Sequence, residues 1–498
     1  MARYKPYDYS QLRMIPVSLE EQLIPGTLEH TIHMVVEHEI DASIFDPRYN
    51  NDQTGRRAYN PKSLLKVVLL SYSRGILGSR RIEQACHEHI IFMALTCGQA
   101  PDHSTIAAFV SSMQKEILVV FQRILLICDR LELLGGTHFA IDGVKLRGNA
   151  SRRFSGTFKE LQQKKEKYKF RLEQMLDEHI ANDQDGKMGD HHANKMKELK
   201  QSIEKIDRFL KEHEPKPGKK KSENKSNVTD NDSTLMVSSH GIVQGYNAQA
   251  MVDSKHQVIV HADAGDSGQD DEHLSMMIKG ARENLQAIGK DDKIIEQSVI
   301  LGDPNYNSPA NLTTCVEENL NAIFPNARFR KTDPGKDASV CEFALNDFIF
   351  NDQEDIYTCP AGKELTRKSD VKKKGKRYYR VYETQESDCK SCGYQKQCFT
   401  RKASKNRSLS VCYDKAVAQY AHQMESKLNT KNGRELYGHR IGIIEPVFAN
   451  IREHKRMDRF SLRGKSKVNI QWLLYCIVHN LEKLSNQGYH PACVASSI

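Results

Sequence analysis

Three acidic residues lie at the edges of predicted structural elements. Asp142 and Asp303 each follow a short apolar run of the kind that forms a buried strand, and Glu445 directly precedes Pro446. Because proline suits the first helical turn and disfavours a helical residue before it, we expect Glu445 at the entry of a helix. Hard divalent cations such as Mg²⁺ need oxygen ligands, and two of them about 4 Å apart can clamp a phosphodiester. The three acids therefore predict a metal site for phosphodiester chemistry.

Other acids compete for the same role, and cations surround the three. Asp253, Asp263, Asp266 and Asp270 lie in or beside strand-like runs and remain alternatives on the same grounds. The cations nearest the three acids are suited to contacts with phosphate, and they are Lys145, Arg147, Arg440, Arg452, Lys455 and Arg456.

Bulk composition limits the class of protein. The chain has 498 residues, with 73 Lys and Arg against 64 Asp and Glu, so its net charge is +9. This excess fits a polyanionic partner without requiring one. No apolar run approaches the roughly 20 residues that span a bilayer, and the first residues lack the apolar core of a signal peptide. Twelve cysteines without an export signal indicate a reducing compartment. We expect a soluble cytoplasmic protein of several domains.

The order of apolar periods predicts an all-helical N-terminal domain followed by an α/β core. Residues 1–135 are mostly helical in pattern, with Asn60 before Pro61 as one N-cap and Asp102 or Ser104 as another. Several capped short helices resemble a helix-turn-helix arrangement, with an ordinary helical bundle as the alternative. Beyond His138 the pattern predicts three strands, a helix, a strand, a helix and a strand, which form a mixed sheet. This core comprises residues 136–154, 236–325 and 431–485, before a tail at 486–498.

Two insertions interrupt the predicted core. The first, residues 155–235, has two series of apolar residues at alternating three- and four-residue steps, typical of an antiparallel coiled-coil hairpin. Lys165 fills one position of its first seam, and the other seam residues are Phe158, Leu161, Tyr168, Leu172, Met175, Met196, Leu199, Ile203, Ile206 and Leu210. The polar, basic stretch 216–227 after the hairpin is predicted to be a disordered linker. The second insertion, residues 326–430, carries a group of cysteines.

The spacing of these cysteines predicts a structural zinc site. Cys389 and Cys392 form a C-x-x-C pair, Cys398 follows closely, and Cys359 lies upstream. Four thiolates in such a pattern suit tetrahedral Zn²⁺. The alternative is a set of reduced thiols, partly buried in a β-rich insertion.

Several motifs, in a fixed order along nearly the whole chain, resemble bacterial insertion-sequence transposases of the DDE type. These motifs are residues 137–151, 243–253, 445–451 and 459–480. The resemblance implies a ribonuclease-H-like core in which Asp142, Asp303 and Glu445 bind two Mg²⁺ or Mn²⁺ ions. It also implies an N-terminal helical domain that binds the terminal inverted repeats of the element. Tyr437 and Arg440 resemble the family's signature around the last acid, with Arg452 where that signature often has lysine.

The implied activity is hydrolysis of a phosphodiester at the element end, followed by attack of the freed 3′-hydroxyl on target DNA. The partners are then double-stranded DNA and further copies of the chain, at least a homodimer on DNA, and the protein associates with the nucleoid when it binds DNA. One motif departs from the family: Asp303-Pro304-Asn305-Tyr306 stands where Asp-Ala-Gly-Tyr is usual. Pro304 removes a backbone donor, and Asn305 is expected to keep the turn by adopting a left-handed conformation. The alternatives are an inactive DNA-binding relative that acts as a repressor, and a non-mobile metal-dependent nuclease.

Overall fold

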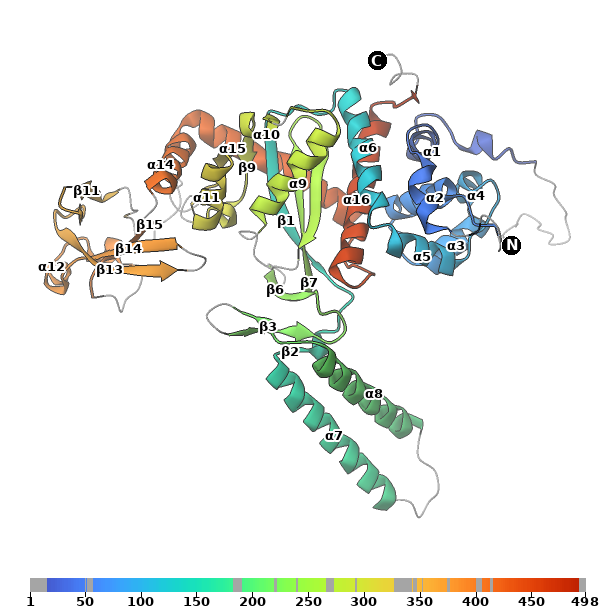
Figure 1. Cartoon of the computed structure of the whole chain (residues 1–498), viewed down its shortest axis with the longest axis horizontal. Coiled ribbons are helices and arrows are strands. Elements are labelled where there is room, and N and C mark those ends of the chain that lie inside the picture. Colours follow the sequence, from blue (N-terminus) through green and yellow to red (C-terminus); the bar gives the residue numbers. More distant parts are fainter. Residues whose placement is uncertain are drawn as a thin grey trace, which may run out of the picture. The chain divides into compact units, whose positions relative to one another are not determined.

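The computed structural model describes residues 16–49, 51, 57–181, 190–218, 222–238, 241–265, 273–291, 293–326, 343, 347–351, 353–373, 377–399, 405–412 and 415–491. These residues form two compact units, both shown in Figure 1. The helical unit comprises residues 1–132, 450–462 and 466–498. The sheet unit comprises residues 133–449 and 463–465. Within the described residues no single helix is long and apolar enough to cross a membrane, and only the bent pair His103–Ser112 and Glu116–Arg130 meets that test jointly.

α-Helices build the helical unit, and several of them begin with a side-chain N-cap. They are α1 (Leu28–His38), α2 (Pro61–Ser73), α3 (Ser79–Glu88), α4 (Ile90–Leu95), α5 (His103–Ser112), α6 (Glu116–Arg130) and α16 (Lys465–Asn486), with a π-helical turn at Asn450–His454. The Asn60 side chain accepts a hydrogen bond from the Lys62 N–H, and Pro61 occupies the first turn of α2. Asp102 accepts from the N–H groups of Ser104 and Thr105 at the start of α5. The predicted caps at Asn60 and Asp102 are confirmed.

Helix α16 is buried around its whole circumference, so it is a core helix of the helical unit rather than a surface helix. Trp472, Tyr475 and Cys476 are all fully buried. The Tyr475 ring packs against Tyr72 of α2, with centroids 5.1 Å apart. A helix that is apolar on every face needs partners on every side. The structure thus groups most of residues 450–485 with the N-terminal helices, whereas the sequence pattern had assigned them to the α/β core.

A mixed six-stranded sheet forms the centre of the sheet unit. Its strands are β1 (His138–Arg147), β6 (Thr234–Ser238), β7 (Gly241–Asp253), β8 (Ile259–Gly265), β9 (Val299–Leu301) and β10 (Asn321–Ile323). Their order is β10-β9-β1-β7-β6, and β8 pairs with the same strand β7. Strands β10, β9 and β1 are parallel, while β7 is antiparallel to β1, β6 and β8. The predicted α/β class with a mixed sheet is confirmed.

Five helices accompany this sheet within the unit. They are α9 (Leu274–Ala287), α10 (Ile294–Gln297), α11 (Pro309–Glu317), α14 (Lys415–Asn429) and α15 (Lys431–Ala449). The buried residues of α9, such as Leu274, Met277 and Ile278, recur at helical spacing. Asn284 of the same helix donates to the Val260 carbonyl of β8, which fixes α9 against the sheet.

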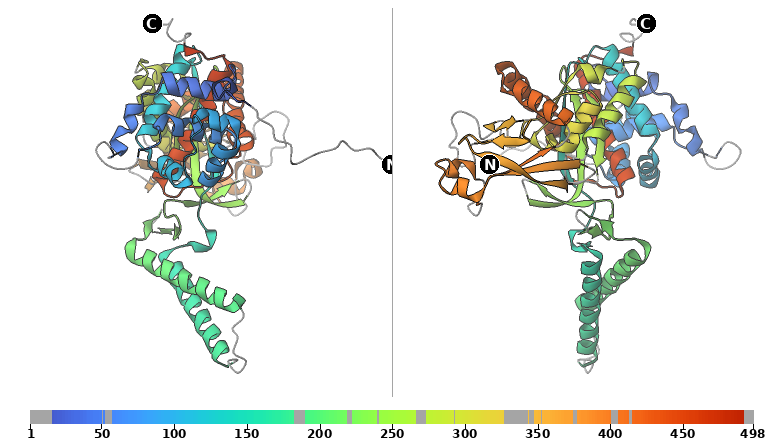
Figure 2. Two further views of the ribbon diagram at one scale, coloured as in Figure 1. Left: turned by 90° about the vertical axis from the view of Figure 1, so that its right-hand side faces the viewer. Right: turned by 60° about the vertical axis from the view of Figure 1, so that its left-hand side comes forward.

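The first insertion is a helical hairpin of α7 (Phe158–Ala181) and α8 (Asp190–Glu212). The two helices lie side by side in Figure 1 and in both views of Figure 2. Leu161, Ile206 and Phe209 form one buried cluster between them, and Met175, Met196 and Leu199 form another. Lys165 is buried at the seam and reaches Asp207 at 3.0 Å. Most predicted seam residues therefore lie between the helices, together with Phe209, which the spacing had not included.

The prediction of a disordered linker at 216–227 is wrong for the residues that the structure describes there. Strand β3 (Lys216–Pro217) pairs with β4 (Glu223–Asn224), and β5 (Ser226–Asn227) pairs with β2 (Ser155–Gly156). The buried Asn227 side chain donates to the Ser151 carbonyl and to the Ser155 hydroxyl. Its carbonyl oxygen accepts from the Thr229 and Asp230 N–H groups. Composition predicts disorder here because these contacts are polar, those to Ser151 and Ser155 join residues more than 70 positions apart, and no apolar period marks them.

The second insertion contains a five-stranded antiparallel sheet. Its strands are β11 (Ile349–Asn351), β12 (Ile356–Thr358), β13 (Glu364–Lys373), β14 (Arg377–Glu383) and β15 (Ser408–Cys412), in that order, with the short helices α12 (Glu386–Lys390) and α13 (Gln395–Cys398) between β14 and β15. Its small core consists of Phe348, Tyr357, Leu365, Tyr382 and Leu409. The predicted β-rich character of this insertion is confirmed.

Candidate active site

Asp142 on β1 and Asp303, two residues beyond the end of β9, occupy matching positions along neighbouring parallel strands. Ala140 of β1 lies opposite Leu301 of β9 in the register of the sheet. Each acid follows its paired residue by two positions, since 142 minus 140 and 303 minus 301 are both 2. Parallel strands keep this register, so both carboxylates leave the sheet at the same edge.

Arg440 of α15 brings a third charged group to these two acids. Its Nη1 lies 2.9 Å from Oδ2 of Asp142, although 298 residues separate the two in sequence. Oδ1 of Asp142 accepts from the Gly143 N–H at 2.8 Å. The side chains are 5% exposed for Arg440 and 20% for Asp142. A charge-assisted bond in such a sheltered place fixes the orientation of the carboxylate.

The surroundings of Asp142 disfavour the ionised form of its carboxyl group. Burial raises the pKa of Asp142 to about 6, the nearby charge of Arg440 opposes this rise, and the negative charge of Asp303 adds to it. Two carboxylates that share a site disfavour each other's ionised form. A cation placed between them would relieve both the burial and the repulsion.

A tight turn holds Asp303. Oδ1 of Asp303 accepts from the Asn305 N–H, and Oδ2 accepts from the Asn305 side-chain amide, both at 2.9 Å. Residues Pro304–Tyr306 form a 3-10 helix with Asp303 as its N-cap. Tyr306 is buried, and its hydroxyl donates to the side chain of Gln249 on β7. The Asp-Pro-Asn-Tyr sequence thus builds its own support for the carboxylate.

The expected left-handed conformation of Asn305 is wrong. Asn305 is not among the described non-glycine residues with positive φ, because it continues a 3-10 turn instead. Pro304 occupies the first position of that turn, where a backbone donor has no partner within the turn. The two departures from the usual motif are therefore compatible with an ordered Asp303.

Glu445 is not at a helix entry as predicted, since it lies inside α15 with Pro446 also inside that helix. A proline there removes the bond that its N–H would donate to the carbonyl four residues earlier, which is that of Gly442. Gln257 replaces this donor, with its Nε2 2.8 Å from the Gly442 oxygen. Glu445 is exposed and follows Arg440 by five residues, about 7.5 Å along the helix axis. Of the three predicted acids, the structure brings Asp142 and Asp303 together and puts Glu445 on the helix that reaches them.

The competing acids have other environments. Asp253 is fully buried, and its carboxylate accepts from the N–H groups of Gly135, Gly136 and Lys255, so it closes the loop before β1. Asp263 lies on β8 opposite Gln249 of β7. Asp266 and Asp270 lie outside the described residues.

The predicted phosphate-binding residues divide between the two units. In the sheet unit, Lys145 donates to the Val237 carbonyl, Arg147 is exposed, and Tyr437 lies with its ring centroid 6.0 Å from the Arg440 guanidinium. Arg440 already forms an ion pair with Asp142, so a contact with DNA would be additional to that pair.

In the helical unit, Arg456 is exposed and Arg452 is half-buried. Lys455 is fully buried, with its Nζ 2.7 Å from both Glu482 and Asn450, so its predicted role in DNA contact is wrong. Burial of a lysine requires such partners, and nothing in the local sequence distinguishes it from its exposed neighbours.

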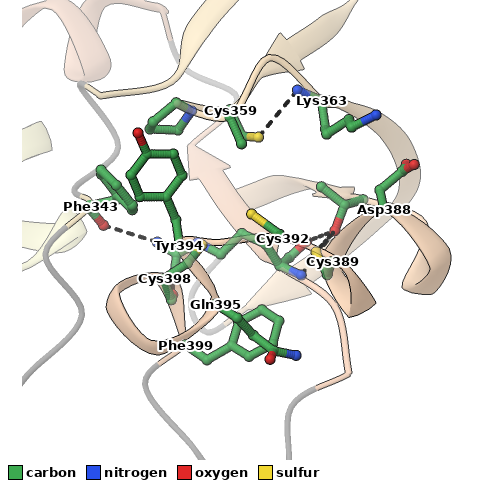
Figure 3. Close-up of a pocket in the computed structure, with 14 residues that line it drawn as sticks. Phe343, Cys359, Lys363, Asp388, Cys389, Cys392, Tyr394, Gln395, Cys398 and Phe399 are labelled. Carbon is green, nitrogen blue, oxygen red and sulfur yellow. Dashed lines mark hydrogen bonds between the residues drawn. The ribbon is translucent and has the colours of Figure 1, made fainter.

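The structure places all four predicted zinc ligands around one pocket of the second insertion. Cys359, Cys389, Cys392 and Cys398 line it, as Figure 3 shows. Among the residues that the structure describes, however, no group of three His, Cys, Asp or Glu side chains is arranged to hold a metal ion. This finding applies to the three acids as well as to the cysteines.

Two family models of known proteins match separate parts of the chain. A transposase domain (DUF772) matches residues 17–112, and a transposase DDE domain matches residues 358–485. The chain belongs to the insertion-sequence transposases of the DDE type. No curated protein matches it.

This family indicates that the chain is a DNA transposase, with DNA as its partner. The range matched by the DDE domain contains Arg440 and Glu445 but neither Asp142 nor Asp303. The pairing of Asp142 with Asp303 in this transposase therefore rests on the sheet register. Sequence reasoning missed Gln249 and Gln257, which support the turn after β9 and the interrupted helix α15. Pro446, which lies inside a long helical pattern, was the signal in the sequence that α15 needs a substitute donor such as Gln257.

Proposed function

We propose that this transposase binds the terminal inverted repeats of its element, hydrolyses a phosphodiester at the element end and transfers the freed 3′-hydroxyl to target DNA. The observation that carries the proposal is the matched register of Asp142 and Asp303, with Arg440 bound to the first. In the proposal the sheet is a ribonuclease-H-like core, and the α7–α8 hairpin is a coiled coil that helps to hold two DNA ends together. The antiparallel strands β1, β7 and β8, extended by the parallel strands β9 and β10, support the core assignment.

The residues fit a pair of Mg²⁺ or Mn²⁺ ions in type and charge. Asp142 and Asp303 offer oxygen ligands close to each other, and the pKa of Asp142 is raised first by burial and further by the negative charge of Asp303. Glu445 would supply the third carboxylate from α15. When bound, the ions would polarise the phosphodiester and stabilise the charge that develops during its cleavage.

The remaining roles belong to side chains of the chain itself. Arg440 orients the Asp142 carboxylate and keeps it ionised, and Asn305 holds both oxygens of Asp303. The exposed Arg147 on β1 would contact phosphate. In the helical unit, the exposed residues Arg80, Arg81, Gln84 and His87 of α3 would contact the inverted repeat.

The decisive experiment incubates the purified protein with Mg²⁺ and a labelled duplex that carries its own element end. We expect a nick at the element boundary from the wild type and from Glu435→Gln, which removes an exposed acid elsewhere on α15. Asp142→Asn and Glu445→Gln should lose nicking by more than about a hundredfold while they still bind the duplex.

Each alternative predicts its own result in this experiment. Binding without any nick from the wild type would identify an inactive DNA-binding relative. Cleavage without joining to target DNA would identify a nuclease. Full activity of Glu445→Gln would remove Glu445 from the site and leave the rest of the proposal in place.

A further inference from the structure

The pocket of the second insertion is built from two tight turns that present thiols. In the first, the Cys359 N–H donates to the Lys363 carbonyl, and the Gly362 N–H donates to the Cys359 carbonyl, both at 2.8 Å. The Lys363 N–H then points at the Cys359 sulfur, at 3.3 Å. Gly362 has a φ of 76°, which a residue without a Cβ adopts freely. The turn thus fixes the position of the Cys359 sulfur by a backbone hydrogen bond.

The second turn presents the C-x-x-C pair from α12. The Cys392 N–H donates to the Cys389 carbonyl at 3.2 Å, so the chain turns back between the two thiols. The Cys389 sulfur lies 3.0 Å from the Thr384 hydroxyl at the end of β14. Cys398 ends α13, and its carbonyl accepts from Arg407 at 3.0 Å. Both turns are therefore anchored to backbone or buried side chains.

None of the four cysteines forms a disulfide, and all four line one pocket (Figure 3). Cys389 and Cys398 are buried, while Cys359 and Cys392 are half-buried. Lys363 and Arg407 also line the pocket and would offset the negative charge of four thiolates around a divalent ion. Cys359 packs against the core of the five-stranded sheet, which has five buried residues in the part of the insertion that the structure describes. Such a small core usually needs a disulfide or a metal to be stable.

We propose that Cys359, Cys389, Cys392 and Cys398 bind one structural Zn²⁺ ion in a tetrahedral site that joins α12 and α13 to the sheet. Four sulfur ligands and a C-x-x-C turn suit zinc, and magnesium does not take thiolates. Among the described residues, the four sulfurs are not arranged around one point. A bound ion would have to draw the sulfurs together through changes of side-chain conformer. Zinc binding releases the thiol protons and adds its binding energy to the folding of the insertion.

The test is the zinc content of the full chain, purified under reducing conditions from zinc-supplemented medium. We expect about one zinc per chain by elemental analysis, and release of that zinc when the thiols are modified. Cys392→Ser should lower the content at least about fivefold, because a half-buried ligand is lost. Cys97→Ser is the matched control, since Cys97 is an exposed thiol in the helical unit, and it should leave the content unchanged.

A second measurement covers the case in which Cys392→Ser fails to fold. Co²⁺ exchanged into the wild type should give the visible bands of tetrahedral thiolate coordination and should be displaced by stoichiometric Zn²⁺. The proposal is overturned if the wild type retains no zinc after purification and dialysis against it. It is also overturned if a variant without all four cysteines keeps its zinc, or if a Cys389–Cys392 disulfide forms in place of metal binding.

Discussion

At the scale of single residues, the ionisation of Asp142 would set the pH range in which the proposed cation binds. Its pKa of about 6 lies above that of an ordinary aspartate, so between pH 4 and 6 the folded chain holds a proton that an unfolded chain releases. The ionised carboxylate is therefore a cost to stability that is fully present above pH 6. A bound divalent cation would remove this cost, and this links the metal affinity to pH.

We predict that the Mg²⁺ concentration for half-maximal nicking falls roughly fourfold between about pH 5.5 and pH 7.5, as the ionised fraction of Asp142 rises from about a quarter to nearly one. Titration of nicking against Mg²⁺ at several pH values measures this shift. An affinity that stays constant over this range would contradict a role for the raised pKa.

Arg440 is expected to matter for stability as well as activity. In Arg440→Gln, Asp142 loses its partner, so we expect a loss of about 3 kcal/mol in the free energy of unfolding. The pKa of Asp142 should rise further, and the pH at which nicking begins should rise with it. Urea unfolding and a pH profile of nicking measure the two effects. Arg147→Gln, which removes an exposed arginine on β1, is the control and should leave stability nearly unchanged.

The sequence predicted the positions of Asp142 and Asp303 because an acid after a short apolar run is a local pattern. It could not predict that Lys455 is buried, since its partner Glu482 is 27 residues away on another helix. The pairing of Asp142 with Arg440 spans 298 residues and is equally invisible to local patterns. Residue type was a poor guide to partners.

At the scale of elements, the break in the hydrogen bonding of α15 gives a specific prediction. Gln257→Ala leaves the Gly442 carbonyl without its donor and should cost about 1 kcal/mol of stability. Pro446→Ala restores the N–H at position 446 and should make the Gln257 substitution nearly neutral. Chemical unfolding of the two single variants and the double variant measures this coupling. Additive effects would show that Gln257 and Pro446 act independently.

Elements with a strong period or a cap could be predicted, and elements fixed by long-range pairing could not. Asn60 with Pro61 and Asp102 mark helix starts by their own side chains. Strands β2 to β5 have two residues each and exist only because Asn227 and Glu223 bond to distant backbone. The helical setting of Glu445 was missed because Pro446 normally begins a helix, and here Gln257 supplies the donor that the proline lacks.

At the scale of the whole molecule, the α7–α8 hairpin is separable from the site. The two ends of the hairpin meet, with the Phe158 and Phe209 rings 5.8 Å apart. Replacement of residues 158–212 by a short glycine linker should therefore leave the melting of the remaining chain nearly unchanged.

The same deletion should abolish complexes that hold two element ends, while single-end binding persists. Circular dichroism and native gels with end duplexes measure these two results. A normal yield of paired-end complexes from the deletion variant would exclude the hairpin from end pairing.

The order of domains along the chain could be predicted in part. Composition and period separate the helical N-terminal region, the sheet and both insertions. Composition and period place α16 in the sheet region, because it follows that region in sequence. An apolar run does not show which domain a fully buried helix packs in. The contact between Tyr72 and Tyr475 shows where that helix belongs.

The position of α16 at the far end of the chain has a consequence for synthesis on the ribosome. The core formed by the helices at residues 28–130 is complete only after α16 has been synthesised. Asp142 can pair with Arg440 only after a further 298 residues have been added. At bacterial rates of 5–20 residues per second, this delay is roughly 15 to 60 s. A nascent or prematurely terminated chain would therefore lack both a complete core in the proposed DNA-binding unit and the Asp142–Arg440 pair. If the proposed function holds, truncated copies of the element should thus be silent rather than inhibitory.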